Sequence, residues 1–248
     1  MKAYRVHEYG DAAKLIEDEV NKPSAKQGHV VVEVKASSLN PIDHKLLKSD
    51  LGINPALPGI LHMDVSGVIT EVGEGVTDFK TGDEIYGCAG GLQGEAGNIE
   101  GALADFMLAD SNLIALKPKS LSFSESAALP LVTITAWEGL FDRAHIKKED
   151  HVLIHGGTGG VGHIAIQLAR QHGARVATTV SSEDKAKVAR GLGAEDIIFY
   201  RDEKVEDYTQ RLTKGKGFDA VFDTIGADNL DKSLEAAKVS GQVIGIIG

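Results

Sequence analysis

The first half of the chain consists of short apolar runs separated by turn-forming residues. From Met1 to about Lys117 these runs have the length of strands, are rich in Val and Ile, and are interrupted by Gly, Pro and Asp. The clearest of them are His29–Ala36, Asp64–Gly73, Asp83–Gly87 and Ala102–Ala109. This pattern predicts a compact β domain over residues 1–117.

Two segments of this half have a different pattern. Pro41–Asp50 predicts a short helix, with Pro41 in the first turn, where a backbone N–H group is not needed. Cys88–Gly101 contains glycines at positions 90, 91, 94, 97 and 101, and this density predicts a loop rather than regular structure.

The second half alternates strands with helices. Leu131–Ala144 predicts a helix that joins the two halves. The buried strands that follow are His151–Gly156, Arg175–Val180, Asp196–Tyr200, Asp219–Asp223 and Gln242–Ile247. After the first strand, helical spacing places on one face Val161, Ile164, Ala165, Leu168 and Ala169. Alternation of this kind implies right-handed βαβ units and a parallel sheet.

Residues 118–248 therefore predict a doubly wound parallel sheet of the Rossmann type, and the whole chain an α/β fold. That sheet usually has six strands, and here the chain ends at Gly248 directly after the fifth. We expect an incomplete sheet, and a chain that is a fragment or a shortened form.

Composition and charge exclude several classes of protein. Of the 248 residues 42% are hydrophobic, and 26 basic against 36 acidic residues give a net charge of −10. This charge disfavours binding to nucleic acid or to an anionic membrane surface. A single cysteine, Cys88, and an N-terminus without an apolar signal core predict a cytoplasmic protein.

A glycine-rich segment between the first buried strand and its helix matches the dinucleotide fingerprint G-x-G-x-x-G. Its residues are Gly157, Thr158, Gly159, Gly160, Val161 and Gly162. In this position glycines allow a tight turn and a close approach of the backbone to a pyrophosphate, and free N–H groups at the helix start face the anion. The alternative is a glycine-rich turn without a ligand.

The residues after the second and third strands favour NADPH over NADH. A free ribose 2′-hydroxyl is usually held by Asp or Glu at the end of the second strand, whereas this strand ends in Ser181 and Ser182. Lys185 and Tyr200 complete a group of hydroxyls, a cation and a phenol that suits a 2′-phosphate. For Lys185 a solvated helix charge is the alternative.

Three further residues lie near the ends of the last two strands of the predicted sheet. They are Gly226, Gly245 and Ile246. Because ligands bind beyond the carboxyl ends of parallel strands, we expect these residues to border the cofactor. Ordinary loop geometry is the alternative explanation for the two glycines.

The order of these parts resembles the medium-chain dehydrogenase/reductase superfamily, and within it the zinc-free quinone oxidoreductase branch, which includes zeta-crystallin-like proteins and enone reductases. The resemblance covers essentially the whole chain. The segments that carry it are Ala36–Lys45, Leu61–Gly87, Gly101–Ala109, Ala127–Leu140, His155–Arg170 and Thr179–Ala194. It implies a GroES-like catalytic domain over residues 1–117, a Rossmann NADPH-binding domain over 118–248, and a homodimer.

The chain departs from the zinc alcohol dehydrogenases where those enzymes bind their metal. Asn40 stands in place of the first zinc-binding Cys, and the Gly-His-Glu segment is replaced by His62-Met63-Asp64. An amide and a thioether are poor zinc ligands, and Cys88 alone cannot build a four-cysteine structural site. We therefore expect no metal. His62 lies one place before the expected ligand, and we interpret it as a loop histidine or one that supports its neighbours.

Without a metal, reduction of a conjugated carbonyl is more feasible than oxidation of an alcohol. Hydride from the nicotinamide reaches an already electrophilic system, and the protein must orient the reactants and donate hydrogen bonds to the developing oxyanion. By resemblance, Asn40 is the amide donor and Asp43 orients cofactor or water near the nicotinamide. Their alternatives are a turn and a helix-start carboxylate.

Two more candidates complete the predicted reaction site. Some relatives carry a tyrosine shortly after this Asp, and in its absence His44 is a candidate proton donor, with water as the alternative. Thr133 matches a family position that touches the nicotinamide, and helix packing is its alternative. Cys88 has no partner base nearby in sequence, so we interpret it as a small apolar residue.

These observations favour an NADPH-dependent reductase that transfers hydride to a quinone or an α,β-unsaturated carbonyl without zinc. A non-catalytic NADPH-binding sensor or crystallin-like protein is the first alternative. A zinc-dependent alcohol dehydrogenase is the second and weaker one.

Overall fold

The computed structural model describes residues 1–94 and 97–246 and divides into two compact units, Met1–Leu131 and Val132–Gly248. We call them the first and the second unit and describe each by itself. The predicted boundary between residues 117 and 118 divides a catalytic domain from an NADPH-binding domain, and this division stays a prediction. Across the described residues, no helix is both long and apolar enough to span a membrane.

The first unit is built around a five-stranded antiparallel sheet in the order β10-β6-β5-β3-β9. Its strands are β3 (His29–Ser37), β5 (Asp64–Val72), β6 (Glu84–Cys88), β9 (Phe106–Asp110) and β10 (Ile114–Leu116). Val30, Val31 and Val32 in β3 are fully buried. Successive buried valines give β3 a place inside the sheet, with pairing partners on both sides. The predicted β domain is confirmed.

The remaining elements of the first unit are short. A three-stranded sheet in the order β2-β1-β4 joins β1 (Lys2–Val6), β2 (Leu15–Glu19) and β4 (Gly59–Ile60). The predicted short helix is α1 (Pro41–Lys48), with Asn40 as its N-cap and Pro41 in its first turn. A 3₁₀ turn covers Ser111–Leu113, and α2 (Phe123–Ala127) starts with a capping box between Ser122 and Glu125.

Two expectations for this unit were wrong in part. The segment Cys88–Gly101 is not all loop, because β7 (Leu92–Gly94) and β8 (Gly97–Ile99) pair antiparallel. The glycines do not prevent pairing, since Gly94 and Gly97 stand at the strand ends; positions 95 and 96 lie outside the described residues. The run Ala102–Ala109 becomes a strand only from Phe106. Ala102 and Leu103 instead donate backbone hydrogen bonds to His62 and Leu61.

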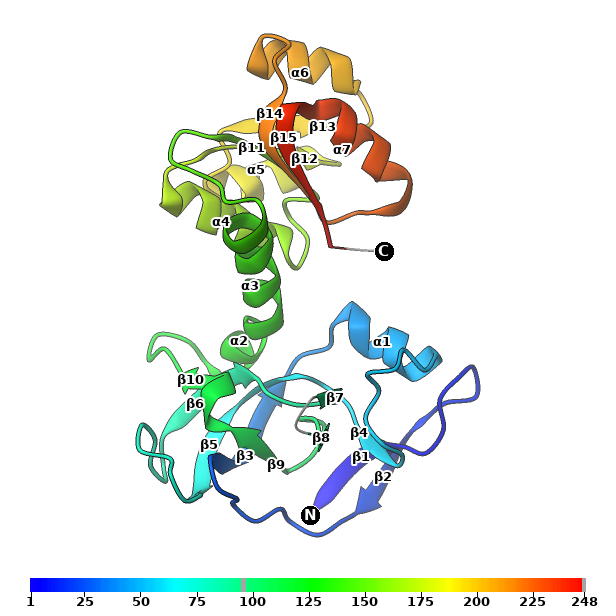
Figure 1. Cartoon of the computed structure of the whole chain (residues 1–248), viewed down its shortest axis with the longest axis vertical. Helices are drawn as coiled ribbons and strands as arrows, with labels where there is room; N and C mark the ends of the chain where they lie inside the picture. The colour runs from blue at the N-terminus through cyan, green and yellow to red at the C-terminus, as the bar shows by residue number, and fades with distance from the viewer. Residues whose placement is uncertain (95–96, 247–248) are drawn as a thin grey trace. The chain divides into compact units, whose positions relative to one another are not determined.

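The second unit, whose elements are labelled in Figure 1, contains a five-stranded parallel sheet. Its strand order is β13-β12-β11-β14-β15. Its strands are β11 (His151–His155), β12 (Arg175–Val180), β13 (Asp196–Phe199), β14 (Phe218–Asp223) and β15 (Ala237–Gly245). All five were predicted; the expected end of the last strand, Ile247, lies outside the described residues. In chain order the arrangement is 3-2-1-4-5, so the doubly wound fold is confirmed.

Both faces of this sheet are covered by helices. Val152 and Ile154 of β11 pack into a cluster with α4 (Gly162–His172) and α5 (Glu183–Leu192), whereas Leu153 between them packs with α6 (Val205–Thr213) and α7 (Leu230–Ala236). This alternation is the period-two pattern of a strand buried on both faces. A 3₁₀ turn, Ala227–Asn229, precedes α7.

The predicted helix Leu131–Ala144 is divided in two. It begins as α3 (Pro130–Trp137) and continues as a π-helix, Glu138–Arg143. The change of winding falls next to Gly139, where a side chain would overlap the ring of Phe222.

Candidate functional site

The glycine-rich loop follows β11 and leads directly into α4. Gly156 has a φ of +72°, which glycine adopts without strain. A Cβ atom on Gly157 would overlap Thr178 Oγ1, and one on Gly162 would overlap the carbonyl oxygen of Gly156. These two positions require glycine because the loop, β12 and α4 pack closely against one another.

Gly160 is different, because the protein itself does not require glycine there. It is exposed, and a Cβ on it would meet only Val132 Cγ1, at 3.7 Å, whereas a Cβ on the exposed Gly159 would lie 3.2 Å from the Gly156 carbonyl oxygen, which is a tight contact. Among the described residues, the backbone N–H groups of Gly160 and Val161 also have no backbone hydrogen-bond partner. An uncovered glycine backbone at the start of a helix fits the pyrophosphate of a dinucleotide.

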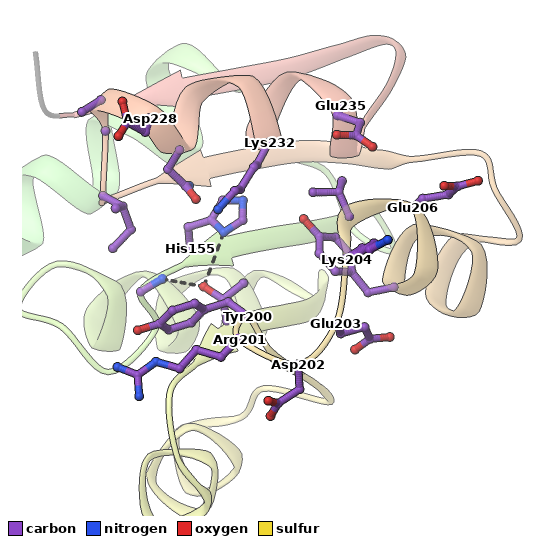
Figure 2. Close-up of a pocket in the computed structure, with 18 residues that line it drawn as sticks. His155, Tyr200, Arg201, Asp202, Glu203, Lys204, Glu206, Asp228, Lys232 and Glu235 are labelled. Atoms are coloured by element: carbon purple, nitrogen blue, oxygen red, sulfur yellow. Dashed lines mark hydrogen bonds between the residues drawn. The ribbon is translucent and has the colours of Figure 1, made fainter.

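A cavity of about 900 Å³ lies at the carboxyl ends of the strands of the second unit (Figure 2). We call it the carboxyl-end pocket. It is lined by His155, Gly156, Thr179, residues 200–206, Tyr208, residues 225–229, Lys232 and Glu235. It therefore includes Gly156 from the loop, Tyr200 after β13 and Gly226 after β14, in agreement with the rule that ligands bind at this edge.

Two buried polar atoms of pocket residues have no hydrogen-bond partner among the described residues: His155 Nε2 and Tyr208 Oη. Both side chains are only 3% exposed. Burial lowers the pKa of His155 to about 4, and burial also raises the pKa of Tyr208. Both groups are neutral at physiological pH. Unpaired donor and acceptor atoms inside a pocket are those to which a polar ligand would form hydrogen bonds.

Asp223, fully buried at the end of β14, fixes the loop that contains Gly226. Its Oδ1 accepts hydrogen bonds from the N–H groups of Ile225 and Gly226, and its Oδ2 accepts from Asn229 Nδ2 and Ser233 Oγ. Burial alone would raise the pKa of Asp223, but these hydrogen bonds outweigh it and hold the pKa below the usual value.

The other predicted cofactor residues lie in the second unit as follows. Ser182 caps α5 by accepting a hydrogen bond from the Lys185 N–H group at 3.4 Å. The side chains of Lys185 and Tyr200 are exposed, and Ser181 lies beside Ser182 at the end of β12. Only Tyr200 of these four lines the carboxyl-end pocket.

Three predicted cofactor residues lie away from that pocket. Thr133 is half-buried on α3 and lines a separate shallow pocket. Gly245 ends β15 in open space, and the Ile246 N–H group donates to the Asp223 carbonyl oxygen. Contact of any of these residues with a cofactor stays a prediction.

In the first unit, the predicted catalytic residues Asn40 and Asp43 belong to a cluster that we call the polar cluster. It consists of Ser37, Ser38, Asn40, Asp43, His62, Asp64 and Cys88. Fully buried Asp64 is its centre: Oδ2 accepts from Ser38 Oγ at 2.6 Å and from Asn40 Nδ2 at 2.9 Å. Oδ1 accepts from the Leu131 N–H group at 2.9 Å.

Asp43 has the helix-start contact that was its alternative role. Its Oδ2 accepts from the Asn40 N–H group at 2.8 Å, while Oδ1 is buried without a hydrogen-bond partner of standard geometry. Burial raises the pKa of Asp43 and also that of Asp64. His44, the third predicted catalytic residue, is exposed on α1, and within the described part of the chain no side-chain hydrogen bond links it to the cluster.

Sequence reasoning gave no catalytic role to His62 or Asp64. His62 Nδ1 lies 3.0 Å from Ser37 Oγ, and the residue has a φ of +70°. The signal in the sequence was a histidine and a carboxylate two residues apart at the start of a predicted strand. A role of His62 and Asp64 in the site depends on their contacts with residues of β3 and α1, which sequence spacing does not reveal.

The polar cluster does not offer a thiolate or a metal site. Burial, followed by the nearby Asp64 carboxylate, raises the pKa of Cys88 to about 12, so the group remains a thiol at neutral pH. Over residues 1–94 and 97–246, no three His, Cys, Asp or Glu side chains are grouped to hold a metal ion.

Comparison with known proteins identifies the family. Residues 26–119 match the family model described as alcohol dehydrogenase GroES-like domain, and residues 160–247 match zinc-binding dehydrogenase. A quinone oxidoreductase of Pongo abelii is 31% identical over 98% of this chain and 72% of its own length. The chain belongs to the medium-chain dehydrogenase/reductase superfamily, in its quinone and enone oxidoreductase branch.

Other relatives cover the chain equally well. A 2-methylene-furan-3-one reductase of Solanum lycopersicum and a chloroplastic NADPH-dependent alkenal/one oxidoreductase of Arabidopsis thaliana are each 36% identical over the whole chain. The chain spans 62% and 63% of their lengths. The crystal structure of an alcohol dehydrogenase superfamily protein from Novosphingobium aromaticivorans matches with a TM-score of 0.92 and 39% identity, over 100% of this chain and 73% of that one.

Proposed function

We propose that this protein is an NADPH-dependent oxidoreductase that transfers hydride to a quinone or an α,β-unsaturated carbonyl. The observation that carries the proposal is the uncovered backbone at Gly160, in a loop whose other glycines are explained by close contacts within the protein. The names of the relatives support both the cofactor and the class of acceptor.

The second unit supplies the groups that we assign to cofactor binding. The glycine loop would hold the pyrophosphate through backbone N–H groups. Ser181, Ser182, Lys185 and Tyr200 would hold the 2′-phosphate. The pocket beyond Gly156 and Tyr200 would take the adenosine, whose base offers polar atoms to His155 Nε2. NADPH, when bound, supplies the hydride; we also assign to its surroundings Thr133, Gly226, Gly245 and Ile246.

The polar cluster supplies the groups that we assign to the reaction. We propose that Asn40 and Asp43 lie near the nicotinamide, where the Asn40 amide donates to Asp64, and that His44 or water provides the proton. We also propose that no zinc takes part, since the amide of Asn40 already donates to Asp64 and Met63 is a poor ligand for zinc. Elemental analysis that found one tightly held zinc per chain would contradict this.

One assay tests the proposed function. The purified protein is mixed with NADPH and a panel of enones and quinones, and NADPH absorbance is followed at the nicotinamide band. We expect consumption with at least one acceptor, and weaker activity with NADH. Binding of NADPH, seen by its fluorescence, without oxidation by any acceptor would instead select a non-catalytic nucleotide-binding protein.

We further propose a cytoplasmic location and a homodimer. The single cysteine supports the location, because it cannot form a disulfide within the chain. Light scattering on the purified protein measures the assembly, and a monomeric mass at all concentrations would contradict the dimer.

A further inference from the structure

The polar cluster contains one hydrogen-bond donor that the cluster itself does not use. Asn40 Nδ2 donates to Ser38 Oγ at 3.1 Å and to Asp64 Oδ2 at 2.9 Å, so both of its amide hydrogens are engaged. Ser38 Oγ donates to Asp64. Asp43 and Asp64 only accept when ionised. A developing oxyanion on an acceptor therefore needs a donor from another side chain.

His62 has a ring nitrogen, Nε2, that is not engaged in a hydrogen bond within the polar cluster. Nδ1 faces Ser37 Oγ, and within the described part of the chain Ser37 makes no other side-chain hydrogen bond. A hydroxyl that donates to Nδ1 leaves the proton of a neutral imidazole on Nε2. Burial lowers the pKa of His62, although Asp43 and Asp64 partly oppose it, so the neutral ring is favoured. Nε2 has no hydrogen-bond partner among the described residues.

The backbone holds this histidine in a strained conformation. Its φ of +70° is one that side chains with a Cβ rarely adopt, and its carbonyl oxygen accepts the Ala102 N–H group at 2.8 Å. A side chain on Gly101 would overlap Leu61 and approach the His62 carbonyl, so the neighbouring chain fits only around this backbone. Strain that the surrounding structure maintains is concentrated at functional positions.

We propose that His62 is the oxyanion donor of this reductase and donates Nε2–H to the carbonyl oxygen of the quinone or enone acceptor. The assignment rests on the proposed function. Hydride passes with its electron pair from nicotinamide C4 to the electrophilic atom of the acceptor, which is reduced while the cofactor is oxidised. Negative charge collects on the carbonyl oxygen, where the neutral imidazole stabilises it. Water then supplies the proton to the enolate or quinol anion, and His62 keeps its own.

The strained backbone makes a sharp test available, because His62→Gly removes the ring and relieves the positive φ together. We expect a melting temperature at least equal to that of the wild type and an NADPH dissociation constant within twofold of it. The turnover number with an enone should fall ~10²–10³-fold, the usual effect of losing one oxyanion donor. Free imidazole at tens of millimolar should restore part of the rate by entering the vacated space.

His145→Gly is the matched control, because His145 also has a positive φ, of +50°, and is exposed in the second unit. It should keep the wild-type rate and show no response to imidazole. A His62→Gly variant with the wild-type rate would overturn the assignment. So would a stable variant that is slow and does not respond to imidazole, since that result indicates a structural role only.

A binding experiment separates failure of this assignment from failure of the proposed function. If none of the tested acceptors supports NADPH oxidation by the wild type, the proposed function fails. The role of His62 is then tested by binding of 4-nitrophenolate, whose phenolate oxygen resembles that of an enolate. Absorbance titration should show binding to the wild type and at least tenfold weaker binding to His62→Gly. Equal affinities, or no binding to the wild type, would overturn the role of His62.

Discussion

Substitutions of single glycines in the nucleotide loop can distinguish glycines needed for folding from glycines needed for NADPH binding. Gly160 has no neighbour that would exclude a methyl group, and its φ is not positive. Gly160→Ala should therefore leave the melting temperature within about 2 °C of the wild type. If the backbone contacts a pyrophosphate here, the added methyl group should weaken NADPH binding by about tenfold or more, roughly 1.4 kcal/mol. Thermal unfolding and fluorescence titration measure the two effects.

Gly162→Ala is the counterpart at the other end of the same loop. A Cβ there would overlap the Gly156 carbonyl oxygen, so the variant should lose about 1–3 kcal/mol of stability, the usual effect of overpacking. In Gly162→Ala, NADPH binding should weaken only to the extent that the added methyl group displaces the loop. Unchanged NADPH affinity in Gly160→Ala would remove the main support for a dinucleotide at this loop.

At the scale of elements, the start of α5 carries the choice between NADPH and NADH. Lys185 is exposed, lies in the first turn of the helix and forms no ion pair with any of the described residues. Lys185→Ala should weaken NADPH binding by about tenfold, the loss of one charge-assisted hydrogen bond, and leave NADH binding unchanged. Lys187→Ala is the control, since Lys187 lies on the same helix and contacts Asp184 at 3.6 Å. Equal effects of both variants on NADPH and NADH would contradict the assignment of the 2′-phosphate.

Elements whose pattern follows from their own burial were predictable from the sequence. The strands of the second unit are parallel and buried on both faces, so they form nearly continuous apolar runs, and β11 to β14 have almost the predicted bounds. β2 was not identified, since four of its five residues are exposed and its sequence has no apolar pattern typical of a strand. Its strand conformation is stabilised by pairing with β1. The hairpin of β7 and β8 was hidden by its glycines.

The candidate site was predictable only where one segment contains it. The glycine loop is continuous in sequence, and the fold places it after β11 as expected. The polar cluster takes side chains from β3, α1, β5 and β6, and its centre, Asp64, is defined by donors that lie 24, 26 and 67 residues away. Resemblance placed Asn40 and Asp43 in this region, but the hydrogen bonds that leave His62 Nε2 without a partner among the described residues required the structure.

For the whole molecule, buried histidines make the free energy of unfolding dependent on pH. The pKa of His155 is about 4 in the folded protein, against 6.5 for an exposed histidine. Below pH 6.5 the unfolded chain binds a proton that the folded protein does not bind. Stability is therefore lost as the pH falls from about 6.5 to about 4, by roughly 3 kcal/mol at most for this residue.

His155→Gln removes this titration while it keeps a polar side chain beside Thr179. Urea unfolding at pH 7 and pH 4.5, followed by fluorescence of Trp137, the single tryptophan, reports on the second unit. The wild type should lose more stability between the two pH values than His155→Gln does. Raised pKa values of Asp43 and Asp64 act in the opposite direction, but they are common to both proteins and cancel in the difference. His44→Gln, at an exposed histidine, should behave as the wild type. Equal losses in wild type and His155→Gln would mean that His155 is not buried in its neutral form.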